Sequence, residues 1–359
     1  MAVFTRMTGQ DFNLGDTVLR RAMLERVATS APFHVLVKNH SPDYVDALGL
    51  RSGDVVYPTK AVFSDALRDH AARGPVVLLE KPGAIRPAGR VDRDVLRRLR
   101  RVARVRRSGG AILSLGAGVV DPPSRLGRAT MRALTIADDM LCWRDPGSAA
   151  WYGFGQVMPD WAFALPASGR AAGPRRKLGL SLRGDRDGPP EEWLSAVARY
   201  AAEAGLEPVA VSQVRIDDGH VHAVADRLRC EAVTWDAAAT HRDQEALVRD
   251  VYAECAMVLS DRLHVLILAA TEGAAPACLM PFAEHKIGRH FDAIGLPGVA
   301  ADVGGMGQAE AVAAFAKAAA RRDEARRCVD DARVRVDAIG REARGRIEAR
   351  LGLGGDAAA

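Results

Sequence analysis

The chain has 359 residues, of which 48% are hydrophobic, and this size predicts two domains of about 150 residues that each bury a core. Its net charge of +5 suits an anionic substrate or surface, while five scattered cysteines without a Cys-x-x-Cys pair exclude a disulfide framework and a thiolate zinc site. No apolar run reaches the roughly 18 residues of a transmembrane helix, and the first residues lack the apolar core of a signal peptide, so a cytoplasmic location is expected.

Helix-like and strand-like segments alternate through the first half of the chain. Apolar residues at helical spacing predict helices over residues 16–29, 64–72, 92–107 and 130–137. Short apolar runs predict buried strands over 33–38, 75–79, 111–115 and 140–143. This alternation predicts a parallel sheet with helices on both faces.

The alternation resumes after a stretch rich in Pro, Gly and Ala, 166–174, which has no periodicity and predicts a linker. Strands are then predicted over 177–182, 207–212, 232–235, 256–260 and 276–281. Helices are predicted over 191–204, 221–228 and 243–254, and from 265 onwards. A long helical region rich in Ala, Arg and Glu follows over 308–351, with a break expected at Gly340.

Together these elements predict an α/β protein of two doubly wound lobes with carboxyl-terminal helices. The first lobe is expected over residues 1–165, the second over 175–305 and the helical region over 306–352. A cleft between two such lobes is where a ligand usually binds.

The most informative segment is Ser260–His264, which is followed further along by Lys286. A buried strand is expected to end at Ser260 and a helix to begin just after His264, so Arg262 and His264 lie on the turn between them. Open α/β sheets bind ligands at the carboxyl ends of their strands. An arginine, a histidine, a lysine and a helix amino terminus together predict a site for a small anion of high charge.

Further motifs also lie at expected strand ends or helix starts. Gly15 permits close approach of a ligand and Asp16 can cap the first helix, although a capping turn alone would explain both. The run 115–122 predicts a glycine-rich loop, but it lacks a full Gly-x-Gly-x-x-Gly pattern and is equally compatible with an ordinary turn. Arg144 and Arg183 each end a predicted strand, and an ion pair with a neighbouring acid is the alternative for both.

The predicted helix over 92–107 contains many arginines, and Leu96, Leu99 and Val102-Ala103 are expected to form its apolar stripe. It is compatible with a solvated helix face, or with docking to anionic lipid or polyphosphate. Nucleic-acid binding is disfavoured, because no aromatic residues interleave for base stacking. The nine histidines do not fall at metal-ligand spacing, so no metal is expected.

In their order along the chain, these motifs resemble those of the polysaccharide pyruvyl transferase family. The matching residues are Asn13-x-Gly15-Asp16, Gly116-x-Gly118 with Pro122, Arg144-Asp145-x-x-Ser148, Asp160–Leu165, Ser181-Leu182-Arg183, Arg262-Leu263-His264 and Lys286. The resemblance implies a glycosyltransferase-B-like fold of two Rossmann-like lobes. It also implies transfer of a pyruvyl group from phosphoenolpyruvate to a sugar hydroxyl, usually closing a cyclic ketal, with phosphoenolpyruvate as substrate and no cofactor.

By the resemblance, Arg144 and Arg262 bind the donor, His264 is catalytic and Lys286 is the family's lysine. Phosphoenolpyruvate carries about three negative charges, and arginine matches its carboxylate and phosphate by bidentate hydrogen bonds. Guanidinium groups from both lobes are therefore expected around one trianion with the imidazole, with Arg183 as a third contact.

The expected chemistry assigns a task to each remaining group. Lys286 neutralises the departing phosphate, and His264 protonates the methylene carbon, unless it only hydrogen-bonds the phosphate. Asp16 is a candidate base for the sugar hydroxyl. Asn13 and Gly15 are expected on the acceptor side, in the first lobe. A glycine triplet usual in the family is replaced here by the run 79–84, which leaves the acceptor sugar open.

Two alternatives remain at this point. A sugar-nucleotide-dependent glycosyltransferase of the same fold would need an acidic residue for the ribose, for which Glu284 is a poor candidate. A non-catalytic protein could associate with membranes through the helix 93–107. Pyruvyl transfer and peripheral membrane contact are compatible, because lipid-linked glycan precursors lie at the inner face of the membrane.

Overall fold

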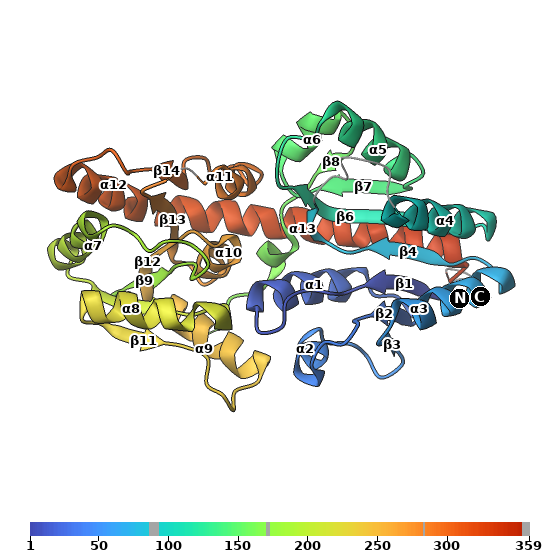
Figure 1. Cartoon of the computed structure of the whole chain (residues 1–359), viewed down its shortest axis with the longest axis horizontal. Helices are drawn as coiled ribbons and strands as arrows, with labels where there is room; N and C mark the ends of the chain where they lie inside the picture. The colour runs from blue at the N-terminus through green and yellow to red at the C-terminus, as the bar shows by residue number, and fades with distance from the viewer. Residues whose placement is uncertain (86–92, 170–172, 283, 354–359) are drawn as a thin grey trace. The chain divides into compact units, whose positions relative to one another are not determined.

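The computed structural model describes residues 1–85, 93–169, 173–282 and 284–353, and the chain divides into two compact units (Figure 1). The first unit comprises Met1–Asp11, Thr17–Trp161 and Arg335–Ala359, and the second comprises Phe12–Asp16 and Ala162–Val334. Asp92, which was expected to begin a helix, and residues 170–172 of the predicted linker lie outside the described residues.

A parallel sheet forms the centre of the first unit, in the order β3-β2-β1-β4-β6-β7-β8, with β5 paired to β6. Its strands are β1 (Val3–Arg6), β2 (Phe33–Leu36), β3 (Val55–Tyr57), β4 (Val77–Glu80), β5 (Gly83–Ile85), β6 (Ala111–Val119), β7 (Met140–Trp143) and β8 (Gln156–Val157). The helices are α1 (Leu14–Val27), α2 (Pro42–Ala47), α3 (Lys60–Arg73), α4 (Arg93–Arg107), α5 (Arg125–Thr135) and α6 (Pro146–Tyr152). The predicted α/β class and parallel sheet are confirmed.

Strand β1 is central to the first unit, although no strand was predicted there. It pairs in parallel with β2 on one side and β4 on the other. Its Phe4 is fully buried and packs in a core cluster with Phe63 of α3 and Val102 and Val105 of α4. Four residues are too few to show a periodicity, so only the neighbouring strands reveal this element.

The glycine-rich loop predicted over 115–122 is wrong, because most of this run belongs to strand β6. All nine residues of β6 are buried. The strand has a register shift between Leu115 and Ala117, and Gly116 there has φ +83°, which favours glycine. Gly116 is a bulge against which Trp161 packs, since a Cβ would lie 2.9 Å from the indole ring.

The second unit contains a six-stranded parallel sheet in the order β11-β10-β9-β12-β13-β14. Its strands are β9 (Lys177–Ser181), β10 (Glu207–Val211), β11 (Glu231–Val233), β12 (Cys255–Ser260), β13 (Ala275–Met280) and β14 (Ala300–Asp302). Its helices are α7 (Glu191–Ala204), α8 (Asp218–Leu228), α9 (His241–Glu254), α10 (Leu263–Thr271), α11 (His285–Asp292) and α12 (Gln308–Ala320). Two 3-10 turns occur at η1 (Trp161–Ala164) and η2 (Arg215–Asp217).

The carboxyl-terminal helices differ from the prediction in where they break. The break lies at Arg321, between α12 and α13 (Arg322–Leu351), and not at Gly340. Gly340 is inside α13, where a Cβ would approach the Cβ of Arg26 to 2.9 Å. The glycine therefore allows close packing of α13 on α1 within the first unit and does not end the helix.

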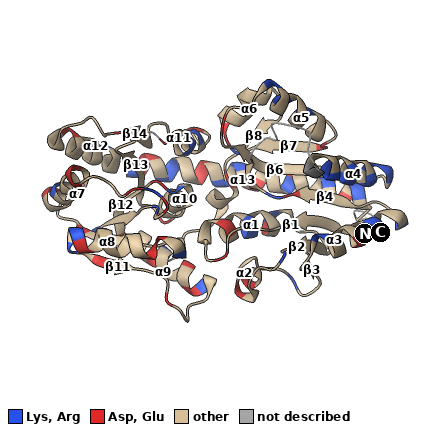
Figure 2. Cartoon of the chain, in the orientation of Figure 1, with Lys and Arg blue, Asp and Glu red and all other residues tan. Residues whose placement is uncertain are grey.

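Helix α4 uses only part of the predicted apolar stripe, since Val102 is buried but the two leucines are not. Val95, Val102 and Val105 are buried, whereas Leu96 is 45% exposed and Leu99 is 36% exposed. Figure 2 shows that Lys and Arg are concentrated on this helix. The valines face the sheet because they repeat on one side of the helix, which leaves the leucines at the surface.

None of the helices in the described part of the chain is both long and apolar enough to span a membrane. All five cysteines are free thiols.

Candidate active site

The turn between β12 and α10 is held by two hydrogen bonds at the carboxyl end of the second sheet. Ser260 pairs with Ser181 in the register of β12 and β9, and its hydroxyl donates to the carbonyl oxygen of Ser181. The backbone N–H of Arg262 donates to the Ser260 Oγ at 2.9 Å. Both serines are buried. The turn therefore has a fixed backbone, and Arg262 immediately precedes the first residue of α10.

Arg262 is clamped by the carboxylate of Asp217. Its Nη2 donates to Oδ1 at 2.6 Å, and its Nε lies 2.5 Å from Oδ2. The Arg262 side chain is 14% exposed and that of Asp217 is 2% exposed. Asp217 also accepts a hydrogen bond from the N–H of Gly184, at 2.8 Å. Because a guanidinium has five N–H donors, this clamp fixes its plane and leaves donors for a ligand.

His264 lies in the first turn of α10, with Gly15 packed directly against it. A Cβ on Gly15 would lie 2.5 Å from the His264 Nδ1, so only glycine fits there. The segment that carries Gly15 is tied down by an antiparallel bridge between Asn13 and Val214. Asn13 and Gly15, expected in the first lobe, therefore belong to the second unit, beside the histidine.

Asp16 does not occupy the cap position that the sequence suggested. Helix α1 begins at Leu14, two residues earlier than predicted, and Asn13 immediately precedes it. The backbone N–H of Asp16 donates to the carbonyl oxygen of Asn13 at 3.1 Å. Asp16 lies in the first turn, where a negative charge is favoured by the helix dipole.

Arg183 follows strand β9 and makes a second, more exposed ion pair. Its Nε and Nη2 donate to the two oxygens of Asp185 at 2.8 and 2.6 Å, and its side chain is 31% exposed. This hydrogen bond raises the pKa of Arg183. The backbone N–H of Arg183 donates to the buried Asp261, whose pKa is raised by burial. Asp261 therefore joins the two loops that follow β9 and β12.

Lys286 lies in the first turn of α11, after strand β13. Its side chain is half-buried. Its carbonyl oxygen contacts the Nδ1 of His290 at 2.7 Å, within the same helix. Glu284, which immediately precedes α11, pairs with Arg186 at 2.8 Å.

Arg144 belongs to the first unit and is almost completely buried there. Its Nη1 donates to Asp160 at 2.8 Å, with the two side chains 2% and 0% exposed. A Cβ on Gly118 would come within 2.7 Å of the Arg144 Nε, so this glycine makes room for the guanidinium. The neighbouring Asp145 caps α6 by accepting from the N–H of Ser148 at 2.8 Å. Several of the predicted motif residues thus hold one another in place.

Sequence reasoning missed Asp217. It lies 45 positions before Arg262, in a short 3-10 turn, and no local pattern marks it. Asp160 belongs to one of the matching motifs, but the sequence predicts no role for it; the structure shows it as the partner of Arg144. Among the residues that the structure describes, no group of three or more His, Cys, Asp or Glu is placed to hold a metal ion.

Two kinds of comparison place the chain among known proteins. The sequence matches the family model for polysaccharide pyruvyl transferase over residues 13–279. No curated protein matches it at a significant level. The matched region contains both arginine–carboxylate pairs and His264 and ends just before Lys286.

Solved structures with low sequence identity share the fold. A putative UDP-N-acetylglucosamine 2-epimerase from Listeria monocytogenes matches with a TM-score of 0.59 and 11% identity, covering 99% of this chain and 97% of that one. The UDP-GlcNAc 2-epimerase from Neisseria meningitidis matches with a TM-score of 0.57 and 10% identity, covering 98% of this chain and 100% of that one. The calicheamicin glycosyltransferase CalG4 matches with a TM-score of 0.53 and 14% identity, covering 100% of this chain and 99% of that one. The fold is therefore the glycosyltransferase-B type.

Proposed function

Since the chain belongs to the polysaccharide pyruvyl transferase family, a family of transferases, we propose that it moves a pyruvyl group from phosphoenolpyruvate to a sugar of a cell-envelope polysaccharide or its lipid-linked precursor. The product is a ketal, and the acceptor is a glycan. The observation that supports this best is the turn of the second unit. There a carboxylate-clamped arginine and a glycine-packed histidine lie two residues apart.

In this proposal the arginines bind the donor. Phosphoenolpyruvate presents a planar carboxylate and a phosphate, and both match the N–H donors of a guanidinium. Arg262 and Arg144 each keep donors beyond those that Asp217 and Asp160 take. Arg183 adds a further cation, and Lys286 neutralises the phosphate as it leaves. Clamped arginines lose little side-chain entropy on binding, which favours a small ligand.

His264 supplies the proton that starts the reaction. The electron pair of the C2–C3 double bond takes this proton at the methylene carbon, C3, and leaves a cationic centre at C2. An oxygen of the sugar then bonds to C2 and gives its proton to a base, for which Asp16 is the candidate. The C2–O bond to phosphate breaks, and a second hydroxyl closes the ketal. Two hydroxyl protons are released, one proton is consumed at C3, and hydrogen phosphate carries the other.

We also propose that the protein works at the cytoplasmic face of the membrane. The support is the surface of α4, where Leu96 and Leu99 are exposed among arginines. Such a combination favours an anionic lipid surface. Replacing both leucines with serine should reduce co-sedimentation with phosphatidylglycerol vesicles. The matched change of Ile216 and Leu247, exposed in the second unit, should leave it unchanged.

The proposed function is tested first by donor binding and then by turnover. Isothermal titration calorimetry should show binding of phosphoenolpyruvate to the full chain, weakened at least tenfold by Arg262→Gln. Arg199→Gln, which removes an exposed arginine of α7, is the control. Phosphate should then be released from phosphoenolpyruvate when lipid-linked saccharides are added. Release of nucleotide from a sugar nucleotide, with no binding of phosphoenolpyruvate, would instead establish a glycosyltransferase.

A further inference from the structure

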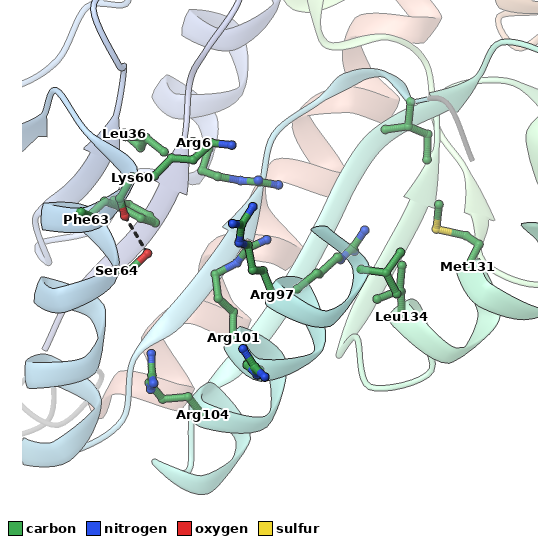
Figure 3. Close-up of a pocket in the computed structure, with 15 residues that line it drawn as sticks. Arg6, Leu36, Lys60, Phe63, Ser64, Arg97, Arg101, Arg104, Met131 and Leu134 are labelled. Atoms are coloured by element: carbon green, nitrogen blue, oxygen red, sulfur yellow. Dashed lines mark hydrogen bonds between the residues drawn. The ribbon is translucent and has the colours of Figure 1, made fainter. Parts of the chain in front are cut away.

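The first unit contains a strongly basic groove that the proposed reaction does not use. It has a volume of about 740 Å³ and lies between α3 and α4, with Met131 and Leu134 of α5 at one side (Figure 3). Seven of its 15 lining residues are Lys or Arg, and none of the described residues that line it is acidic. We call it the arginine groove.

Its cations come from three elements of the first unit, β1, α3 and α4. Arg6 is the last residue of β1 and Lys60 is the first residue of α3. Arg97, Arg101 and Arg104 are spaced by four and three positions along α4, so that they share one face of the helix. Figure 3 shows Arg6 and Lys60 on one side of the groove and the α4 arginines on the other.

The carboxylate of Glu80 forms ion pairs with part of this cluster. It is buried, and it pairs with Arg6 at 2.9 Å and with Arg98 at 3.3 Å. Burial alone would raise the pKa of Glu80, but Arg6, Arg98 and Arg101 outweigh it and lower the pKa to about 2. Glu80 is therefore ionised, and its single charge is far smaller than the charge of the seven cations.

The side chains suit binding and not proton transfer. Besides the cations, the groove is lined by apolar residues such as Leu36 and Phe63, and the described lining includes no histidine and no carboxylate. Arginines in a row on one helix face repel one another, and an anion with several charges relieves that repulsion. The number of cations exceeds what one phosphate can use, since each guanidinium matches a pair of phosphate oxygens.

We propose that the arginine groove binds the diphosphate group of the activated glycan acceptor. This identification of the ligand rests on the proposed function. A sugar activated for envelope assembly is attached through a diphosphate either to a nucleotide or to a lipid, and both carry the same adjacent phosphates. The arginines bind those phosphates, and the apolar residues contact what is attached to them.

The test is calorimetry of the full chain with inorganic pyrophosphate, compared with inorganic phosphate. The wild type should bind pyrophosphate more tightly than inorganic phosphate. The triple change Arg97→Gln, Arg101→Gln and Arg104→Gln should weaken that binding at least 100-fold. The control changes Arg68 and Arg73 of α3 and Arg107 of α4 to Gln. It removes the same amount of charge from residues that do not line the groove. Thermal unfolding of both variants checks that they fold.

Two further probes separate the sources of the diphosphate. UDP-N-acetylglucosamine that displaces pyrophosphate would indicate a nucleotide-linked acceptor. Stronger retention on phosphatidylcholine vesicles doped with a polyprenyl diphosphate than on vesicles doped with phosphatidylglycerol, lost in the groove variant, would indicate a lipid-linked one. Equal loss of binding in groove and control variants, or no binding of pyrophosphate by the wild type, would overturn the proposal. Equal retention on both kinds of doped vesicle, without pyrophosphate binding, would show a general membrane surface.

The result does not depend on pyruvyl transfer. Binding of pyrophosphate in the groove requires neither phosphoenolpyruvate nor turnover. If the wild type binds pyrophosphate but not phosphoenolpyruvate, the proposed function fails and the groove remains an anion site of a different enzyme. If it binds phosphoenolpyruvate and releases phosphate while the groove variant behaves as the control, only the groove proposal fails.

Discussion

The arginines of the motif turns and those of the arginine groove are held in opposite ways. Arg262 donates a hydrogen bond to the buried carboxylate of Asp217 at 2.6 Å, and Arg144 donates one to that of Asp160 at 2.8 Å. In the groove, Glu80 pairs with two of the seven cations that line it, Arg6 and Arg98. A clamped arginine has its direction fixed before a ligand arrives, which suits a small anion in one orientation. A cluster with excess charge attracts a larger anion and tolerates several orientations.

The largest effect is expected from a change at His264, two residues from the clamped Arg262. His264→Gln removes the proton donor but keeps a hydrogen-bonding side chain. We expect turnover to fall about 10²–10⁴-fold, with little change in the affinity for phosphoenolpyruvate. Phosphate release and calorimetry measure the two quantities. Retained turnover with weakened donor affinity would show that the histidine only binds the phosphate.

The next change breaks the clamp itself. Asp217→Asn leaves the Arg262 guanidinium largely buried without its counter-charge. We expect the free energy of unfolding to fall by about 3–5 kcal/mol, measured by urea denaturation. In the exposed pair, Asp185→Asn should cost no more than about 1 kcal/mol. Equal losses for the two variants would mean that burial does not distinguish these ion pairs.

The position of the histidine can be disturbed from the opposite side. Gly15→Ala places a methyl group 2.5 Å from the His264 Nδ1, so either α10 or the start of α1 must move. We expect a loss of about 1–3 kcal/mol in the free energy of unfolding, together with a fall in turnover. Gly219 in α8 has open space around it, so Gly219→Ala should be neutral or stabilising. Unchanged turnover in Gly15→Ala would show that the contact does not position His264.

The smallest expected effect concerns a buried acid beside the basic cluster. Burial raises the pKa of Asp138 to about 7 and outweighs the opposing effect of nearby Arg98 and Arg106. The folded chain binds this proton more tightly than the unfolded chain does. The contribution of the protonated carboxyl to stability is therefore fully present below about pH 4 and is lost as the pH rises through 7.

Asp138→Asn should therefore remove that loss. At pH 8 the variant should exceed the wild type by at least about 1 kcal/mol, the equivalent of one pKa unit, and the difference should shrink at pH 5. Thermal unfolding at the two pH values measures it. A difference that is the same at both would show that the carboxyl group is already ionised in the folded chain.

Local patterns predicted most of the elements, because a buried strand or an amphipathic helix is encoded by consecutive residues. Strand β7 and helix α7 begin and end where predicted. The pattern failed where an element is short, as for β1. It also failed where glycine serves packing, as for Gly116 in β6, because a glycine in a strand and a glycine in a loop look alike in sequence.

By itself, the sequence determined the α/β class, the family, and the junction of a strand and a helix near Arg262 and His264, although α10 begins at Leu263 and so includes the histidine. These depend on neighbouring residues and on the order of motifs along the chain. Only the tertiary structure decided that Asp217 clamps Arg262, that Gly15 packs on His264, and that the arginines of α4 line a groove with Arg6 and Lys60. The reason is physical: parallel strands bring residues that are distant in the chain to one edge of a sheet, and no local periodicity records which of them meet.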